Sequence, residues 1–346
     1  MTIAINASSI DGILEQIQAV IGGTFTERWG EHILTIDNEF AKGSISFIQF
    51  DWGGNLVKHD IVFYNNVEMI IDASNYNPIN FLYTNEGHFY HQFRIENKKR
   101  KIEQFQPAII TSKDEGFNHY FFDKGVKCHL NVIQINRVEF LNTRLNDASL
   151  LNKSLYEVFH DEQHENVFAY TGTFNLKISN LVKRLNSVKQ KGMIRIMMKE
   201  GIVYQILSAH LLQHTKDLKR KKKSNTSLTK KELNTIRKVG QQILKDVSKD
   251  YTVDDLAAEC GLSQAKLQEG FKILYTRTVI EYLRHVRLEE ARDLLNNTDY
   301  NISQVVYSIG FSSRSYFSKI FKRKYGISPS KFLANKKEAK VKEVQL

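Results

Sequence analysis

The chain has 346 residues, 42% of them hydrophobic and 25% charged, and this composition excludes a wholly disordered protein. The two cysteines, Cys128 and Cys260, give no disulfide framework and no Cys-x-x-Cys zinc or redox site. No apolar stretch has membrane-spanning length and no signal-peptide pattern is present, so we expect a cytoplasmic protein with no membrane partner.

The net charge of +11 is unevenly distributed along the chain. Residues 1–216 carry 22 basic and 23 acidic side chains, a net charge of −1, whereas residues 217–346 carry 27 basic and 15 acidic side chains, a net charge of +12. Clustered lysine and arginine release counterions from nucleic-acid phosphates. The asymmetry therefore favours a nucleic-acid-binding end joined to a neutral region.

From Gly43 to about Phe140 the sequence is typical of β-structure. Turn-forming Gly, Asn and Asp residues separate short β-rich runs, which lie at 44–50, 67–71, 79–83, 107–110 and 130–136. Such regular spacing predicts a β-sandwich or a small barrel. The many aromatic residues of this region suit an apolar or sugar-like ligand, and they also suit a simple hydrophobic core.

After Leu145 the apolar residues follow a helical period. Their spacing predicts two helices, at about 173–190 and 192–215. The basic run 219–227 that follows has no apolar residue and predicts an exposed, flexible linker. From Thr229 to Leu333 the sequence is mostly helical, with no strand-like alternation.

One pattern occurs twice in the basic part, at 256–272 and 305–322. Each copy has a short helix, a turn of Gly, an apolar residue and Ser, and a second helix, and the second copy carries one extra residue. Gly261 and Gly310 allow the positive φ that ends a helix, and Ser263 and Ser312 are suitable N-caps. The pattern predicts two helix-turn-helix motifs, although a single copy would also fit a plain helical hairpin.

Between the two copies, 278–297 reads as one amphipathic helix. Twenty residues span about 30 Å. The major groove returns to the same face of DNA after about 34 Å. A rigid helix of this length can hold two recognition helices in successive grooves.

Residues 235–335 resemble the DNA-binding domain of AraC/XylS-type bacterial transcription regulators, which has two helix-turn-helix motifs. The similar segments are Leu256–Ser263, Phe271–Lys272, Tyr282–Ala291, Ile302–Val305, Ile309–Phe311, Ser315–Lys322 and Gly326–Pro329. The resemblance implies an α+β chain with an N-terminal β-rich, cupin-like barrel, a helical dimerisation segment and a C-terminal all-α domain. We therefore expect a sensor domain at 1–145, the dimerisation segment at 146–216, a linker at 217–230, the DNA-binding domain at 231–336 and a basic tail at 337–346.

The resemblance also indicates which side chains contact DNA. The base-facing positions of the two recognition helices fall on Gln264, Ala265, Gln268, Glu269, Arg314, Ser315, Ser318 and Lys319. The expected phosphate contacts are Lys266, Lys272, Lys322 and Arg323. Glutamine pairs with adenine, and arginine and lysine favour guanine. Glu269 departs from the basic residue that the family often has there.

These features predict a transcription regulator, not an enzyme, that binds double-stranded promoter DNA. The resemblance implies a homodimer that contacts RNA polymerase, and we expect it to bind a small-molecule effector. No cofactor and no metal are expected. One alternative is a metal-dependent cupin-type enzyme, for which His88, His91, His119 and His129 are the available ligands, but the His-x-His pattern and downstream Glu of such enzymes are missing. The other alternative is a non-specific architectural nucleic-acid-binding protein, which would explain the charge but not the repeated turns.

Overall fold

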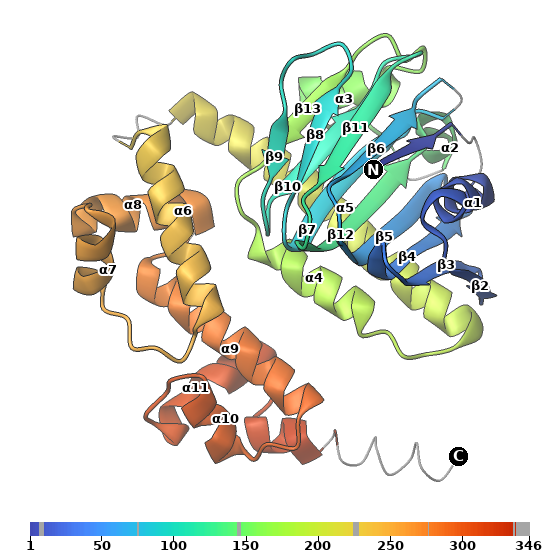
Figure 1. Ribbon diagram of the computed structural model, residues 1–346. Coiled ribbons are helices and arrows are strands. Elements are labelled where there is room, and N and C mark those ends of the chain that lie inside the picture. The colour runs from blue at the N-terminus through green and yellow to red at the C-terminus, as the bar shows by residue number, and fades with distance from the viewer. Residues whose placement is uncertain are drawn as a thin grey trace. The chain divides into compact units, whose positions relative to one another are not determined.

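The computed structural model describes residues 1–6, 10–74, 76–143, 147–223, 228–275, 277–334 and 336 (Figure 1). The chain divides into two compact units, Met1–Ser224 and Asn225–Leu346. The first is rich in β-structure and the second is helical, which confirms the α+β layout expected from the sequence. None of the described helices is long and apolar enough to cross a membrane.

In the described residues of the first unit, the strands form two sheets. The larger sheet has the order β13 (Phe168–Thr171), β10 (Pro107–Thr111), β7 (Ile79–Glu86), β12 (Lys127–Ile135), β5 (Gly54–Phe63), β4 (Ala41–Phe50), β3 (Glu31–Asp37) and β2 (Thr24–Arg28). The smaller sheet has the order β1 (Thr2–Ile5), β6 (Val67–Asp72), β11 (Phe117–Phe122), β8 (Phe89–Phe93) and β9 (Arg100–Ile102). Neighbouring strands are antiparallel except β1 and β6, which pair in parallel.

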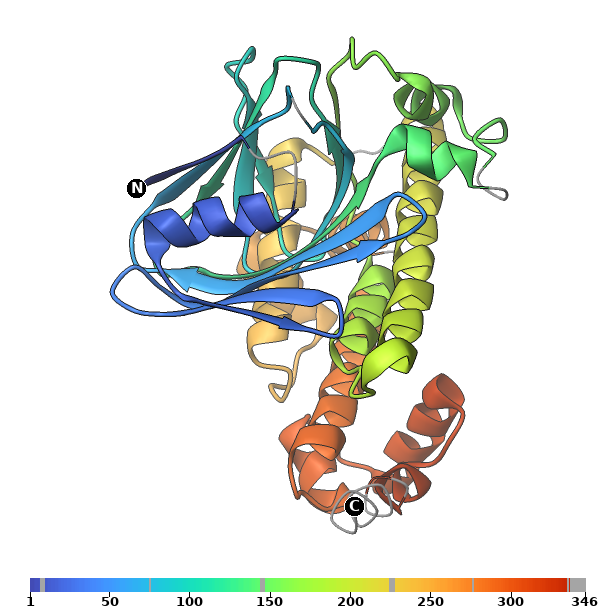
Figure 2. The ribbon, with the colours of Figure 1, turned by 90° about the vertical axis from the view of Figure 1, so that its right-hand side faces the viewer.

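The two sheets share one hydrophobic core, to which both contribute buried residues such as Phe47 and Leu130 from the larger sheet and Met69 and Phe89 from the smaller. In strands such as β6 and β11, alternate residues point into this core because side chains in a strand alternate between the two faces. Helix α1 (Ile10–Ile21) packs against β1, β3 and β4 and adds Leu14 and Ile17 to the core (Figure 2).

The described residues of the first unit also form the helices α2 (Arg137–Asn142), α3 (Lys153–His160), α4 (Leu176–Asn186) and α5 (Gly192–Lys223). Helix α5 packs along α4 and against β10. Trp52, in the turn between β4 and β5, stacks on Phe50 and lies 4.5 Å from the ring of Tyr204 in α5. Near the end of α5, the buried Asp217 carboxylate accepts hydrogen bonds from the Tyr170 and Thr173 hydroxyls.

Three features of the first unit differ from the sequence-based expectations. Helix α1 and the strands before Gly43 were not predicted, and strand β13 lies inside the 146–216 segment that was expected to be helical. Helix α5 continues to Lys223, so the first part of the expected 217–230 linker is helical. The reason is that lysine and arginine are good helix formers, and no Gly or Pro interrupts the run. Residues 224–227 of the linker and the 337–346 tail lie outside the described residues.

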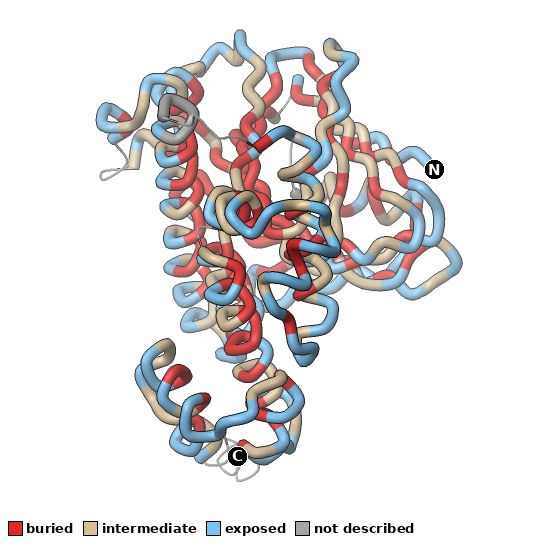
Figure 3. Tube along the Cα trace, turned by 90° about the vertical axis from the view of Figure 1, so that its left-hand side faces the viewer, coloured by how far each residue is buried: buried red, intermediate tan, exposed pale blue. Residues whose placement is uncertain are grey.

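The second unit consists of six helices in its described residues between 230 and 325. They are α6 (Lys230–Lys245), α7 (Val253–Cys260), α8 (Gln264–Tyr275), α9 (Val279–Asn297), α10 (Ile302–Ser308) and α11 (Arg314–Tyr325). These helices have buried positions as well as exposed ones (Figure 3), and their buried positions include the apolar core residues. In the first half of the unit, around α7 and α8, the rings of Phe271 and Tyr282 pack together. In the second half, around α10 and α11, Leu295, Phe317 and Phe321 belong to one hydrophobic core.

Candidate nucleic-acid interface

The first helix-turn-helix motif consists of α7, a tight turn and α8. Gly261 ends α7 with a φ of 65°, as the sequence predicts. The Ser263 hydroxyl accepts the Lys266 amide at 3.3 Å and caps the start of α8. Ala257 and Leu267 are buried where the two helices meet, so the sequence places α8 against α7 with its N-terminal residues towards solvent.

The second motif consists of α10, a turn and α11. Gly310 has a φ of 72°, again as predicted. The expected N-cap Ser312 is wrong: Ser313 caps α11, and its side chain accepts the Tyr316 amide at 3.2 Å. The extra residue of this copy lies in the turn between Gly310 and Ser313, which moves the cap one position along the chain.

Helix α9 joins the two motifs, and its bounds confirm the helix predicted at 278–297. Arg287, buried on this helix, donates to the carbonyl oxygens of Val247 and Lys249 at 2.8 Å in the loop before α7. Its guanidinium also lies 5.4 Å from the ring centre of Phe311, in the turn of the second motif. Arg287 therefore connects the first half of the unit to the second.

Gly310 lies against the loop before α7. A Cβ built on Gly310 would lie 2.3 Å from the Ser248 carbonyl oxygen and 2.8 Å from an Arg287 Nη atom. A Cβ on Gly261 would meet nothing within 4 Å. Position 310 therefore requires glycine for two reasons, its positive φ and the lack of room for a Cβ atom. Position 261 requires glycine only for its positive φ.

In the first recognition helix, several predicted DNA-reading side chains already have protein partners. Gln264 is exposed and donates to Asp254, and Gln268 is half-buried and accepts the Val279 amide at 3.1 Å, at the start of α9. Ala265 is exposed and Glu269 is half-buried. The side chain of Gln268 therefore connects α8 to the start of α9 through this hydrogen bond.

Of the two expected phosphate contacts in α8, Lys272 is exposed and Lys266 is paired with Glu232 of α6 at 2.6 Å. The hydrogen bond from Lys266 and those from Thr229 lower the pKa of Glu232 to about 2. Glu232 is therefore ionised at neutral pH and offsets the charge of Lys266.

The second recognition helix is more strongly basic on its exposed face. Arg314, Ser315 and Lys319 are exposed, as are Lys322 and Arg323, and Ser318 is half-buried. The next lysine turns inwards: the Lys324 Nζ lies 2.5 Å from the Glu289 carboxylate of α9, which Arg292 also contacts at 3.0 Å. Burial opposes ionisation of Glu289, but these two cations lower its pKa overall.

Sequence reasoning assigned no role to Arg287 or Lys324. The sequence does contain one indication that Arg287 is buried: it lies between the apolar residues Val286 and Leu288, which are both buried in α9. Lys324 gives no comparable signal, because it ends an uninterrupted run of three basic residues from Lys322.

The four histidines of the alternative metal site each meet a different partner. The paired atoms are His88 Nε2 and Asp123 Oδ2 at 3.0 Å, His91 Nε2 and Asn118 Oδ1 at 3.0 Å, His119 Nδ1 and Glu68 Oε1 at 2.8 Å, and His129 Nε2 and Asn186 Nδ2 at 2.9 Å. Among the described residues, no three His, Cys, Asp or Glu side chains are grouped as metal ligands would be.

Comparisons with known proteins agree with this geometry. The family described as "Helix-turn-helix domain" matches residues 256–335. Transcriptional activator AggR of Escherichia coli is 38% identical over 96 residues, which are 28% of this chain and 36% of AggR. Probable transcription factor PqrA of Proteus vulgaris is 37% identical over 83 residues, 24% of this chain and 68% of PqrA. The solved DNA-binding domain of AdpA, in complex with a target DNA, is 26% identical, with a TM-score of 0.29 over 29% of this chain and 91% of that one.

Two helix-turn-helix motifs on one connecting helix define a DNA-binding unit with a double helix-turn-helix. The chain belongs to the AraC/XylS family of transcription regulators, which confirms the resemblance found in residues 235–335. The relatives AggR and PqrA are described as a transcriptional activator and a probable transcription factor. The chain spans 10% to 45% of the length of other curated relatives that it matches.

Proposed function

We propose that the chain is a sequence-specific transcription regulator that inserts α8 and α11 into successive major grooves of promoter DNA. The observation that carries the proposal is the pair of helix-turn-helix motifs joined by the 19 residues of α9. At about 1.5 Å per residue, α9 spans about 28 Å. This length is comparable to the repeat of about 34 Å between successive major-groove sites.

In this proposal, bases are contacted by Gln264, Ala265, Gln268 and Glu269 of α8 and by Arg314, Ser315, Ser318 and Lys319 of α11. Lys266, Lys272, Lys322 and Arg323 contact phosphates. The second helix supplies most of the specificity, because Arg314 and Lys319 are exposed. In contrast, Gln264 and Gln268 of the first helix have protein partners.

Substitutions in α11 test this assignment. We expect Arg314→Ala and Lys319→Ala each to weaken binding to the specific site by about 1–3 kcal/mol and to relax the sequence preference. We expect Lys322→Ala to weaken binding to all sequences alike and to reduce the dependence of affinity on salt. Fluorescence anisotropy with a DNA site selected in vitro, against random DNA and over a range of salt, measures both effects.

Lys153→Ala is the matched control, because Lys153 is an exposed lysine on α3 of the first unit. This variant removes the same charge and should leave both affinities unchanged. Specific binding by Arg314→Ala and Lys319→Ala that equals that of the control would overturn the assignment of the second recognition helix.

We propose further that the chain activates transcription as a cytoplasmic homodimer in contact with RNA polymerase, in response to a small molecule held by its β-rich, cupin-like unit. Activation is supported by the relative AggR, which is described as a transcriptional activator. Exposed apolar residues near the start of α5, namely Met193, Ile194 and Met197, support a dimerisation surface.

Sedimentation of the full chain and of its Ile194→Glu variant tests the dimer. Because Ile194 is 59% exposed, the new glutamate would remain in solvent in a monomer and should not disturb its fold. A dimeric parent and a monomeric variant support the surface, whereas a parent that remains monomeric at micromolar concentration contradicts the dimer. Transcription in vitro with and without the purified chain tests activation.

A further inference from the structure

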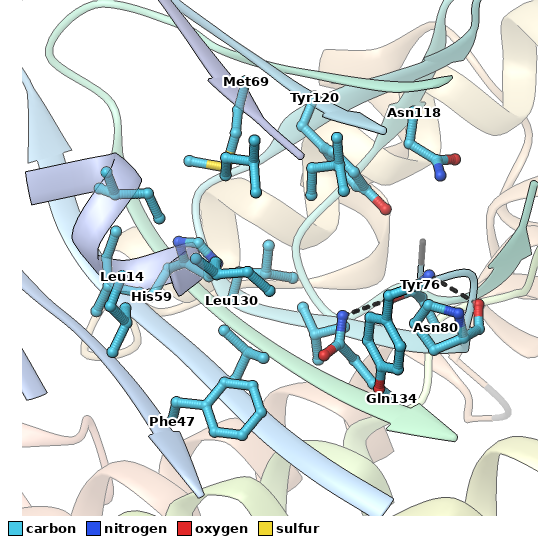
Figure 4. A pocket seen from close by; sticks show the side chains of 18 of the residues that line it. Leu14, Phe47, His59, Met69, Tyr76, Asn80, Asn118, Tyr120, Leu130 and Gln134 are labelled. Atoms are coloured by element: carbon cyan, nitrogen blue, oxygen red, sulfur yellow. Dashed lines mark hydrogen bonds between the residues drawn. The ribbon is translucent and has the colours of Figure 1, made fainter. Parts of the chain in front are cut away.

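A cavity lies between the two sheets of the first unit, beside α1. It is lined by side chains from α1 and from both sheets, among them Leu14, Phe47, Met69 and Leu130 (Figure 4). The cavity gives water about 70 Å³ of space, and one water needs about 10–15 Å³ by the same measure. About five waters therefore fit, and they occupy about 150 Å³ as liquid, a volume in the range of a small organic molecule.

The lining changes character from one end of the cavity to the other. Leu14, Phe47 and Leu130 lie towards one end, together with the ring of His59, whereas Tyr76, Asn80 and Gln134 gather at the opposite end (Figure 4). A ligand that matches this lining has a hydrocarbon body and one polar end.

The polar end holds hydrogen-bonding capacity that the protein does not use. The Gln134 Nε2 donates to Asn80 Oδ1 at 3.1 Å, but the buried Oε1 of Gln134 has no hydrogen-bond partner in the described part of the chain. The Tyr76 hydroxyl accepts from Asn55 at 2.7 Å, which leaves its own proton to donate. Buried polar atoms without partners are rare and call for an explanation.

The cavity offers little that would stabilise an ionised ligand. Among the described lining residues there is no lysine or arginine, and the carboxylate present, Asp72, accepts hydrogen bonds from the Ser74 amide and hydroxyl. His59 lies in the wall with its Nδ1 buried and unpartnered, and burial lowers the pKa of His59 to about 4. The ring is therefore uncharged at neutral pH.

We propose that this cavity binds a small uncharged amphiphile, with its hydrocarbon part against Leu14 and Phe47 and a hydroxyl or carbonyl group at Gln134 and Tyr76. The proposal rests on the proposed function, in which the β-rich unit is the receptor for an effector. A carboxylate or ammonium ligand is disfavoured, because moving an unpaired ion out of water costs far more than moving a hydroxyl that gains a partner.

Three ligands with the same six-carbon chain test the charge preference. The full chain is titrated calorimetrically at pH 7.5 with 1-hexanol, sodium hexanoate and hexylammonium chloride. We expect 1-hexanol to bind with a dissociation constant at least tenfold lower than that of either ion. No detectable binding of 1-hexanol, or binding of hexanoate that is as tight, would overturn the proposal.

Two substitutions test the position of the ligand. We expect Gln134→Leu to weaken 1-hexanol binding three- to tenfold, whereas Gln49→Leu, at an exposed position of β4 in the same sheet, leaves it unchanged. Equal affinities of these two variants would show that Gln134 does not hold the hydroxyl.

Val132→Phe tests the cavity itself, because the larger side chain fills it, and we expect this variant to abolish binding. If Val132→Phe does not fold, the comparison of Gln134→Leu with Gln49→Leu still decides the test.

The affinity for the selected DNA site, measured with and without 1-hexanol, separates this proposal from the proposed function. Binding of 1-hexanol without a change in DNA affinity supports the cavity assignment and argues against the effector response. A DNA response to another compound, with no binding of 1-hexanol, overturns the cavity assignment and leaves the effector response standing.

Discussion

At the scale of single residues, the DNA-binding unit depends on a small number of close contacts between its two halves. Arg287 bonds to the loop before α7, and Gly310 lies against the same loop. The glycines of the two helix-turn-helix turns look equivalent in the sequence. The structure distinguishes them, because only at Gly310, of the two turn glycines, does neighbouring backbone fill the space where a side chain would begin.

Alanine at each turn glycine measures this difference. Gly261→Ala is expected to cost about 1–2 kcal/mol, the cost of a left-handed conformation for an L-residue. Gly310→Ala is expected to cost about 1–3 kcal/mol more, because its Cβ would also overlap the Ser248 carbonyl oxygen. Hydrogen exchange of backbone amides in α10 and α11 reports the stability of this region, and equal losses in the two variants would contradict the steric argument.

Gln268 gives a second test at this scale, because its side chain accepts the Val279 amide. We expect Gln268→Ala to cost about 1 kcal/mol of stability through the lost hydrogen bond. Its effect on sequence preference should be smaller than that of Arg314→Ala. Amide exchange at the start of α9, together with anisotropy on the selected site, separates the two effects. A larger change in specificity than for Arg314→Ala would make α8 the dominant reading helix.

At the scale of elements, α9 and α11 are joined by an ionic cluster of Glu289, Lys324 and Arg292. The Tyr325 hydroxyl adds hydrogen bonds to the Leu288 carbonyl at 2.9 Å and to Glu289 at 3.1 Å. The cluster fixes the second recognition helix on the connecting helix, on the side opposite to its exposed basic residues. The orientation of Arg314 and Lys319, which we propose as base contacts, therefore depends on groups outside the proposed set of DNA contacts.

This cluster makes the stability of the second unit pH-dependent. The folded pKa of Glu289 lies below its unfolded value of about 4.3, so the stabilisation is present above that value and is lost as the pH falls through the folded pKa. At pH 7, Glu289→Gln should cost about 3 kcal/mol, and the difference from the parent should shrink as the pH falls towards 3.

Denaturant unfolding followed by circular dichroism, at several pH values, measures this dependence. Glu290→Gln, at the next and exposed position of α9, is the control and should show no such difference. A cost of Glu289→Gln that is the same at pH 7 and pH 3 would show that ionisation of Glu289 is not its source.

The elements also show why the two units differ in how well the sequence predicts them. The second unit is defined by local signals, namely capping residues, turn glycines and helical periodicity, and these signals give α9 almost to the residue. The first unit depends on distant pairing: β1 pairs in register with β6 from Thr2 and Glu68 onwards, and no local pattern encodes that partnership. The same limit explains why β13, a strand of four residues between helices, was missed.

The cavity was also beyond prediction from sequence, for the same reason. Asn80 and Gln134 are 54 positions apart in the chain, and they lie together only in the folded sheets. Of the aromatic residues that suggested a ligand site, Phe47 lines the cavity, whereas Trp52 packs against Tyr204 of α5 and the Tyr83 hydroxyl donates to the Asn175 carbonyl.

At the scale of the whole molecule, the proposed dimer makes a prediction about truncation. Residues 225–346 form a compact unit of their own, so we expect this fragment to bind a single selected site as tightly as the full chain. On DNA with two such sites, the full chain should bind at least tenfold more tightly, because linking two units raises the effective concentration of the second. Anisotropy on one-site and two-site DNA measures both affinities, and an equal gain for the fragment would contradict dimerisation through residues 1–224.

The packing of Trp52 against α5 has a practical consequence for following communication between the units. Both tryptophans of the chain, Trp29 and Trp52, belong to the first unit, and the DNA-binding unit has none. Selectively excited tryptophan emission therefore does not report unfolding of the second unit itself. A change in that emission when DNA is added would have to arise in the first unit. Trp52, beside Tyr204, is therefore an intrinsic optical reporter of any effect of DNA on the first unit.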